Sequence, residues 1–168
     1  MKMKFVAMAV FFGIITLFLR FVFKVLKAHV ARVFPEDYAA LKKKYPSPLH
    51  KWIWLSGTLS TKYTFPPFQF KGTLKIEVYQ DQLIVSSCGQ GLCLPYDKCT
   101  FKQKKILFLN HLVVENVPVN EYKDSVSIGA VDFGETTTLT VGLSAKKINT
   151  ILALVQRKGA EAAPAQNA

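Results

Sequence analysis

The chain has 168 residues, half of them hydrophobic, and its 22 Lys and Arg against 11 Asp and Glu give a net charge of +11. This length suits one domain of ordinary size with an extension, and it excludes a large multidomain enzyme. A charged fraction of 20% also excludes a wholly disordered chain. Such a basic and apolar composition is typical of proteins that meet either nucleic acid or a membrane.

The positive charge is concentrated near the N-terminus. Residues 1–34 contain six basic residues and no acid, whereas residues 52–158 have a net charge of only +4. A mildly basic body weighs against a nucleic-acid partner. The expected partners are therefore membrane lipids and a membrane or cytosolic protein that the sequence does not identify.

An uncharged apolar run from Phe5 to Leu19 predicts a membrane anchor. If the helix continues to Phe23, it reaches about 28 Å, close to the hydrocarbon core of a bilayer at roughly 30 Å. We therefore expect a single-pass transmembrane helix, with a basic amphipathic extension, within residues 1–34. The side chains assigned to the bilayer interior are Phe5, Phe11, Phe12, Leu17, Phe18 and Leu19.

Two other interpretations of the apolar run remain open. A cleaved signal peptide fits the basic start, but no convincing small-x-small cleavage site appears before Arg32. A buried core helix is the second alternative, although such a helix is seldom apolar on every face.

Basic side chains follow the apolar run and predict contacts with phospholipid headgroups. Arg20, Lys24 and Lys27 recur at helical spacing as one stripe. More positive charge follows the run than Lys2 and Lys4 provide before it, so the C-terminal domain is expected on the cytoplasmic side of the cell membrane. The expected headgroup contacts are Arg20, Lys24, Lys27, Arg32, Lys42, Lys43 and Lys44.

Residues 35–51 are expected to form a short helical connector. Pro35 and the acids after it are typical of a helix start, and Lys42 to Lys44 are typical of a last turn. Trp52 and Trp54 follow, and they are expected either to anchor at a membrane interface or to pack against the domain.

Residues 52–158 have the pattern of an all-β domain. In residues 72–79, Leu74, Ile76 and Val78 alternate with polar residues and Tyr79, as in a half-buried strand. A turn is expected at Gly89-Gln90-Gly91. Regular spacing without intervening helices favours an antiparallel sandwich or barrel. Further strands are expected at residues 83–86, 92–94, 100–109, 111–117, 125–131 and 136–142.

The last element is expected to be a helix. Ser144 is a typical N-cap, and apolar residues at helical spacing follow it as far as Gly159. Residues 159–168 are small and polar, which predicts a disordered tail. The apolar positions of this helix are Ile148, Ile151, Leu152 and Val155.

Consecutive antiparallel strands closed by one C-terminal helix resemble pleckstrin-homology-like domains. The segment LKIEVYQDQLIVSS…GLCLPYDKCTF, with its Pro95-Tyr96-Asp97, is also similar to the GRAM and bacterial PH-like pattern. The resemblance covers residues 53–158 and implies binding of lipid headgroups, peptides or proteins rather than catalysis. Phosphoinositide specificity is not implied, because only Lys71 and Lys75 stand around the first hairpin.

The cysteines do not have the pattern of a metal or catalytic site. Cys88, Cys93 and Cys99 are spaced C-x4-C-x5-C, which lacks the C-x-x-C pair of zinc knuckles. Neither a catalytic residue nor a metal or other cofactor is therefore expected. A small enzyme with Cys93 or Cys99 as nucleophile is the remote alternative.

Lys98, Lys102 and Lys104 form a possible binding surface of the domain, because their parity places them on one face of a strand. Such a surface could contact anionic headgroups. The simpler interpretation, which we favour, is a solvated edge strand that its lysines protect from aggregation.

Together these features predict a mostly β protein. An N-terminal transmembrane helix would precede an antiparallel PH-like barrel or sandwich with one C-terminal helix. The expected function is that of a membrane-anchored binding or adaptor protein, which presents its PH-like domain to a lipid headgroup or a protein partner. The alternative is an exported lipid- or ligand-binding β-domain whose N-terminus is a signal or anchor.

Overall fold

The structure is a computed structural model that describes residues 2–31, 33–60, 67–118 and 137–162. The helices in these ranges are α1 (Lys2–Ala31), α2 (Tyr38–Lys44) and α3 (Ala145–Ala162). The strands are β1 (Glu36–Asp37), β2 (His50–Ser60), β3 (Phe68–Val78), β4 (Gln82–Ser87), β5 (Gln90–Pro95), β6 (Thr100–Ile106), β7 (Leu109–Glu115) and β8 (Thr138–Gly142).

These strands form one antiparallel sheet in the order β1-β5-β4-β3-β2-β8-β7-β6. The sheet is open, with β1 and β6 at its edges, so the predicted barrel or sandwich is wrong. The physical reason lies in β2, which pairs with β3 over most of its length and with β8 through residues 57–60. One long strand thereby joins both halves of the body into a single sheet. Strand spacing along a sequence does not reveal such shared pairing.

Two side chains near the start of β2 differ in their surroundings. The register of β2 against β3 shifts between Trp52 and Leu55, and Trp54 at this bulge has a φ of 58°. The Trp52 ring stacks on His50 with centroids 6.0 Å apart, and the Lys147 ammonium lies 5.3 Å from its centroid. Trp52 therefore packs against its neighbours, whereas Trp54 is 80% exposed.

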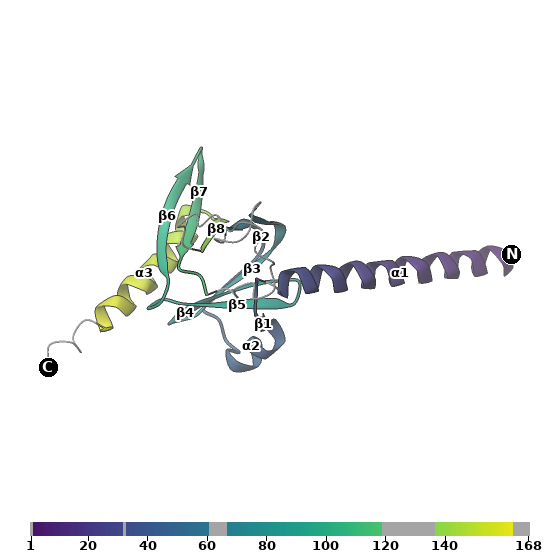
Figure 1. The fold of residues 1–168 in the computed structure, drawn as a ribbon, viewed down its shortest axis with the longest axis horizontal. Helices are drawn as coiled ribbons and strands as arrows, with labels where there is room; N and C mark the ends of the chain where they lie inside the picture. The colour runs from purple at the N-terminus through teal and green to yellow at the C-terminus, as the bar shows by residue number, and fades with distance from the viewer. Residues whose placement is uncertain (1, 32, 61–66, 119–136, 163–168) are drawn as a thin grey trace, which may run out of the picture.

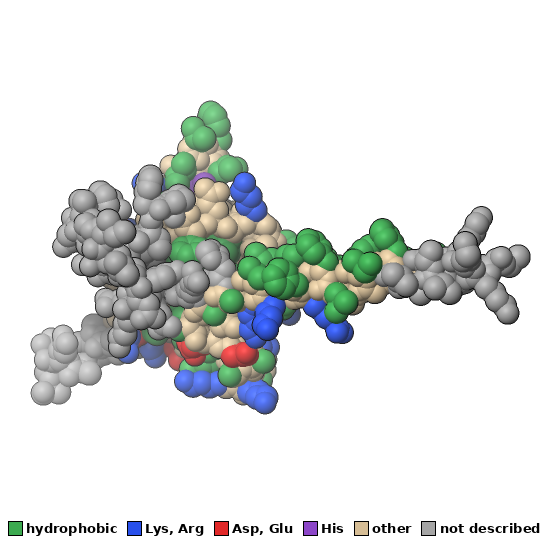
Figure 2. All heavy atoms as spheres, turned by 45° about the vertical axis from the view of Figure 1, so that its right-hand side comes forward, with side chains coloured by type: hydrophobic (Ala, Val, Ile, Leu, Met, Phe, Trp, Pro, Cys, Tyr) green, Lys and Arg blue, Asp and Glu red, His purple; other side chains and the backbone are tan. Residues whose placement is uncertain are grey.

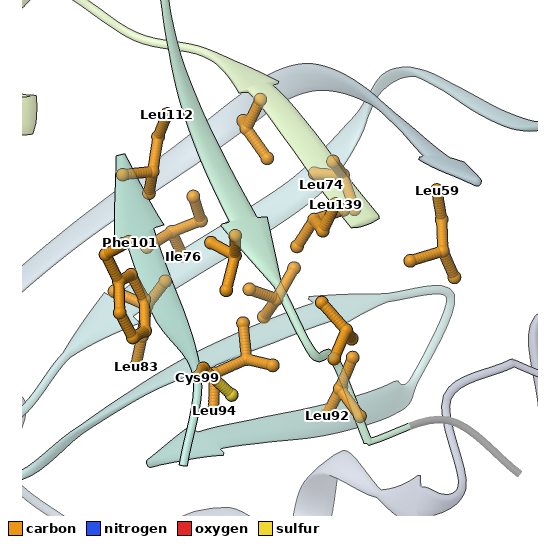
Figure 3. Packing of buried hydrophobic residues seen from close by; sticks show 14 of the residues in the cluster. Leu59, Leu74, Ile76, Leu83, Leu92, Leu94, Cys99, Phe101, Leu112 and Leu139 are labelled. Carbon is orange, nitrogen blue, oxygen red and sulfur yellow. The ribbon is translucent and has the colours of Figure 1, made fainter. Parts of the chain in front are cut away.

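Alternation along β3 builds the core. Leu74, Ile76 and Val78 are completely buried on one face of the sheet, as their period of two predicts. Figure 3 shows Leu74 and Ile76 among apolar side chains from β2, β4, β5, β6, β7 and β8. The helix α3 begins one residue after the predicted N-cap and adds Ile148 and Ile151 to this core. We call the sheet together with α2 and α3 the β-domain.

The helix α1 projects away from the β-domain, with its N-terminus at the far end (Figure 1). Only its C-terminal end meets the core. Val30 and Val33 are buried, and the completely buried Phe34 stacks its ring on that of Phe70 with centroids 5.3 Å apart. The last turn of α1 is therefore a structural part of the domain.

The predicted transmembrane anchor is wrong. Among the residues that the structure describes, no helix combines the length and hydropathy needed to cross a bilayer. The uncharged run of α1 ends at Leu19, and Arg20, Lys24 and Lys27 follow it within the same helix. At 1.5 Å per residue, the fifteen uncharged residues from Phe5 to Leu19 span about 22 Å, less than the roughly 30 Å of a hydrocarbon core. The predicted single-pass topology and the predicted location in the cell membrane both depended on this anchor, so they are wrong as well.

Several other predictions concern positions outside the described residues. These are the strand at residues 125–131 and the headgroup contact Arg32, and the same holds for the side chain of Phe5. Of the tail expected at residues 159–168, the part up to Ala162 is helical and belongs to α3.

Candidate functional site

Large apolar side chains lie exposed along α1. Phe11, Phe12, Leu17, Phe18 and Leu19, five of the six residues predicted to meet a bilayer, are each 60–67% exposed. Adjacent positions such as 17, 18 and 19 point in different directions around a helix, so the exposure is not confined to one face. Figure 2 shows these apolar side chains along the projecting helix. Folded proteins rarely expose apolar surface of this extent, and such surfaces are typical of interaction sites.

Basic side chains follow the apolar stretch of α1 toward the β-domain. Arg20 and Lys24 are exposed. Lys27, the third member of the predicted stripe, lies 3.5 Å from the Asp37 carboxylate. The backbone N–H of Ala39 donates to this carboxylate and, together with Lys27, holds the pKa of Asp37 below its ordinary value. Lys27 therefore links α1 to the start of α2, while Arg20 and Lys24 remain available to a ligand.

The last turn of α2 carries three predicted headgroup contacts, and they point to different surroundings. Lys42 turns inward, donates to the Pro46 carbonyl at 3.1 Å and lies 3.7 Å from Glu77. Lys44 lies over the ring of Tyr45, and a hydrogen bond with that residue raises the pKa of Lys44. Lys43 is exposed. The predicted set is thus divided between structural contacts and exposed charge.

The connector begins differently from the prediction. Its acids Glu36 and Asp37 form β1, which pairs with β5, and the helix begins at Tyr38 with Asp37 as its N-cap. This helix covers the outer face of the sheet, where Leu41 packs on Ile84 and Tyr79. A pattern of acids before a helix fits both a first turn and a cap, so the sequence alone could not place the boundary.

A buried carboxylate lies beneath α2. Glu77 on the outer face of β3 is completely buried, because α2 covers a face that the alternation predicted to be solvated. Its Oε1 accepts a hydrogen bond from Tyr38 at 2.9 Å, and the Lys75 ammonium lies 3.2 Å away. With Lys42 nearby, the negative charge is neutralised and hydrogen-bonded, as a buried charge requires. This cluster fastens α2 to the sheet.

Tyr79 completes the polar cluster under α2. Its hydroxyl donates to the Tyr45 carbonyl at 2.8 Å and lies 3.4 Å from Oε2 of Glu77. Burial, and then the negative charge of Glu77, raise the pKa of Tyr79 to about 12. The phenol therefore stays protonated near neutral pH and serves as a hydrogen-bond donor.

The thiols of Cys93 and Cys99 are not activated. Cys93 donates to the Gln82 side-chain carbonyl at 2.8 Å, and Cys99 is buried in the core. Burial raises the pKa of each thiol to about 11, and a cysteine nucleophile reacts as the thiolate. Among the residues that the structure describes, no three His, Cys, Asp or Glu lie close enough together to hold a metal ion.

The lysines of the predicted binding surface are separated by the fold. Lys102 and Lys104 lie on one face of β6, as their parity predicts, but Lys98 lies in the turn before this strand. The Lys102 ammonium is 2.7 Å from Glu115 on β7. Lys98 and Lys104 are exposed, and β6 is an edge of the sheet. Lysines on an exposed edge suit the simpler interpretation, protection against edge-to-edge pairing.

Sequence reasoning missed the most exposed apolar group on the β-domain. A strand was expected from residue 100 to residue 109, but the chain turns at Leu107 and Phe108, which are 86% and 90% exposed. Neither residue is a usual turn former, so propensity gave no signal. The available signal was a run of four large apolar residues from Ile106 to Leu109, bounded by lysines and by Asn110.

Comparison of the chain with protein-family models, with curated proteins and with solved structures finds no match. The functional argument therefore rests on the chemistry of the surfaces described above. Two of these surfaces combine exposed apolar side chains with unneutralised positive charge: α1, and the turn between β6 and β7.

Proposed function

We propose that this protein is a lipid-surface binding module without catalytic activity. In this proposal α1 lies in the surface of a bilayer with its apolar side chains buried among the lipids. The β-domain is held beside that surface, where it binds a lipid headgroup or a protein partner. The observation that carries the proposal is the exposure of 60–67% at five large apolar side chains of α1.

The energetics of burial favour a partner that covers these apolar side chains. A Phe or Leu side chain gains about 1.5–3 kcal/mol when it is fully removed from water. A lipid surface buries the apolar side of a helix that lies in its plane and keeps the basic side chains of that helix at the headgroups. In α1, Phe11, Phe12 and residues 17–19 are the apolar side chains that such a surface would cover.

The charge beside the apolar stretch favours anionic lipid in particular. Arg20 and Lys24 are exposed directly after Leu19, and residues 1–34 contain no acid. A basic side chain near an anionic leaflet contributes about 1 kcal/mol to binding. Apolar burial and charge attraction therefore act on the same helix.

Because α1 is attached to the β-domain, lipid binding by the helix also positions the domain. Phe34 on Phe70 and Lys27 on Asp37 hold the end of the helix against the body. A helix fixed in this way also holds the β-domain at the surface. Confinement there raises its effective concentration toward any partner in or on the membrane, so weak contacts become occupied.

The resemblance to pleckstrin-homology-like domains supports a binding role. Along the chain, β2 to β8 all belong to one antiparallel sheet, in which β5 and β6 are not neighbours, and α3 then packs over the core; the resemblance rests on this order of elements along the chain. The neutral thiols of Cys93 and Cys99 weigh against the cysteine-enzyme alternative.

Vesicle flotation tests the proposal. The full-length chain is mixed with vesicles of phosphatidylcholine, with and without phosphatidylglycerol, and centrifuged in a density gradient. We expect the wild type to float, and to float more completely with the anionic lipid. Leu17→Asp and Phe18→Asp should stay in the dense fraction, because a charge in the apolar region is costly.

The matched control is Leu49→Asp, which introduces the same charge at an apolar side chain that is 55% exposed on the β-domain. It should float like the wild type. A wild type that remains in the dense fraction, or an equal loss in all three variants, would contradict the proposed function.

A further inference from the structure

We propose that the turn between β6 and β7 is a second lipid contact of the protein, separate from α1. We call the four residues Ile106, Leu107, Phe108 and Leu109 the hairpin tip. The inference rests on the proposed lipid binding, and it names a part of the β-domain that touches the bilayer.

The hairpin tip presents its apolar side chains to the outside of the β-domain. Ile106 pairs with Leu109, so Leu107 and Phe108 form a two-residue turn at the apex. Their exposed fractions rise from 40% at Ile106 to 86% and 90% at the apex. The hairpin projects from the body (Figure 1), and apolar side chains gather at its end (Figure 2).

The backbone of the apex is unfavourable for the residue it carries. Leu107 has a φ of 55°, in the left-handed region, where a residue with a Cβ is disfavoured by roughly 1–2 kcal/mol. Two-residue hairpins ordinarily place Gly, Asn or Asp at such a position. A leucine there costs stability and presents an apolar side chain to the outside. Backbone strain of this kind concentrates at functional sites.

Positive charge directly behind the tip selects the lipid surface as its partner. Lys104 and Lys105 are exposed on opposite faces of β6, and neither forms an ion pair with a described residue. The only acid of the hairpin sequence is Glu115, at its far end and paired with Lys102. An apolar apex followed by lysines matches the order of a bilayer, with acyl chains inside and anionic headgroups at the rim.

The depth of the tip in the bilayer can be measured on the full-length chain. Phe108→Trp places a fluorophore at the apex, and Leu49→Trp places one at a control position. Fluorescence is recorded with phosphatidylcholine–phosphatidylglycerol vesicles whose acyl chains carry bromine, a contact quencher. The unsubstituted protein gives the fluorescence of Trp52 and Trp54, which is subtracted from that of each variant.

We expect bromine to quench the added fluorescence of Phe108→Trp and to leave that of Leu49→Trp unchanged. If the chain floats with vesicles but the added tryptophan at position 108 is not quenched, the hairpin inference is overturned and the proposed function stands. If the chain does not float, both the proposed function and the hairpin inference are contradicted.

A second variant separates insertion from folding. Leu107→Gly relieves the positive φ, so its melting temperature should equal or exceed that of the wild type. Its vesicle affinity should nevertheless fall by roughly tenfold, since a leucine side chain no longer leaves water. Unchanged affinity would contradict the inference. So would self-association of the wild type without lipid that Leu107→Gly abolishes, because the tip would then bind a second copy of the chain.

Discussion

The ring of Phe34 stacks on the ring of Phe70 with centroids 5.3 Å apart and planes inclined by 19°. Phe34 follows the last turn of α1, and Phe70 lies in β3, so this pair joins the projecting helix to the sheet. Phe34 is completely buried. A helix whose large apolar side chains from Phe11 to Leu19 are exposed is therefore fastened to the core by a residue that follows it closely in the sequence.

Replacement of Phe34 should destabilise the whole domain. Phe34→Ala removes a fully buried ring, and we expect the free energy of unfolding to fall by about 3–5 kcal/mol. Chemical denaturation of the full-length chain measures this change. The control Phe21→Ala removes a ring on α1 that is 65% exposed, and it should change stability by less than about 0.5 kcal/mol. Equal effects would show that Phe34 does not belong to the core.

Loss of the buried Glu77 carboxylate should lower the free energy of unfolding more than loss of the Glu115 carboxylate, whose ion pair is shorter but more exposed. Glu77→Gln leaves Lys75 and Lys42 facing a neutral side chain, and we expect a loss of about 3 kcal/mol in the free energy of unfolding. Glu115→Gln removes a shorter ion pair, 2.7 Å from Lys102 on the exposed hairpin, and should cost less than about 1 kcal/mol. Urea denaturation of both variants decides the matter, and a smaller effect at Glu77 would refute the structural role of its cluster.

Titration of Tyr79 should weaken the fold at alkaline pH. The fold raises the pKa of this phenol from 10.0 to about 12. Because the folded value lies above the unfolded one, the contribution is fully present below pH 10 and is lost as pH rises toward about 12. At 1.36 kcal/mol per pKa unit it is at most about 3 kcal/mol.

The test compares the wild type with Tyr79→Phe between about pH 9 and about pH 12. The stability advantage of the wild type should shrink over this window, since the phenylalanine ring of the variant cannot ionise. A constant difference would mean that the hydroxyl does not titrate as proposed.

A methyl group at Gly57 should disturb the pairing of β2 with β8. A Cβ there would lie 2.6 Å from the Thr140 carbonyl oxygen and 2.8 Å from Cδ1 of Leu74. The backbone oxygen cannot move without breaking the ladder, so Gly57→Ala should cost about 1–3 kcal/mol. Gly142→Ala, whose nearest neighbours would be 3.9 Å away, is the control within the same sheet. Similar thermal unfolding of the two variants would contradict the close packing.

Local patterns in the sequence were sufficient where neighbouring residues decide the structure. The alternation of Leu74, Ile76 and Val78 predicted a strand with one core face, and the spacing after Ser144 predicted α3. The inward face of β3 follows from hydrophobic periodicity alone. The same pattern assigned Glu77 to solvent, because it does not show that α2 covers the outer face.

The rest of the fold depended on contacts between distant segments or on unusual local geometry. The length of β2 decides that the strands form one open sheet, and the turn at Leu107-Phe108 has no turn residue. In α1 the apolar run was counted as a membrane span. The helix itself is continuous, but Arg20, Lys24 and Lys27 follow the apolar run directly. Five of the exposed apolar residues of α1 could be named from the sequence, but the hairpin tip could not.

The central claim, that α1 buries its apolar side chains in a lipid surface, is tested most directly by a fluorophore on the helix itself. Phe18→Trp is introduced in the full-length chain, and its fluorescence is followed with anionic vesicles whose acyl chains carry bromine. The account predicts a blue-shifted emission that bromine quenches, after subtraction of the signal of the unsubstituted protein. An emission that stays at the wavelength of a water-exposed tryptophan, unquenched by the brominated lipid, would contradict it.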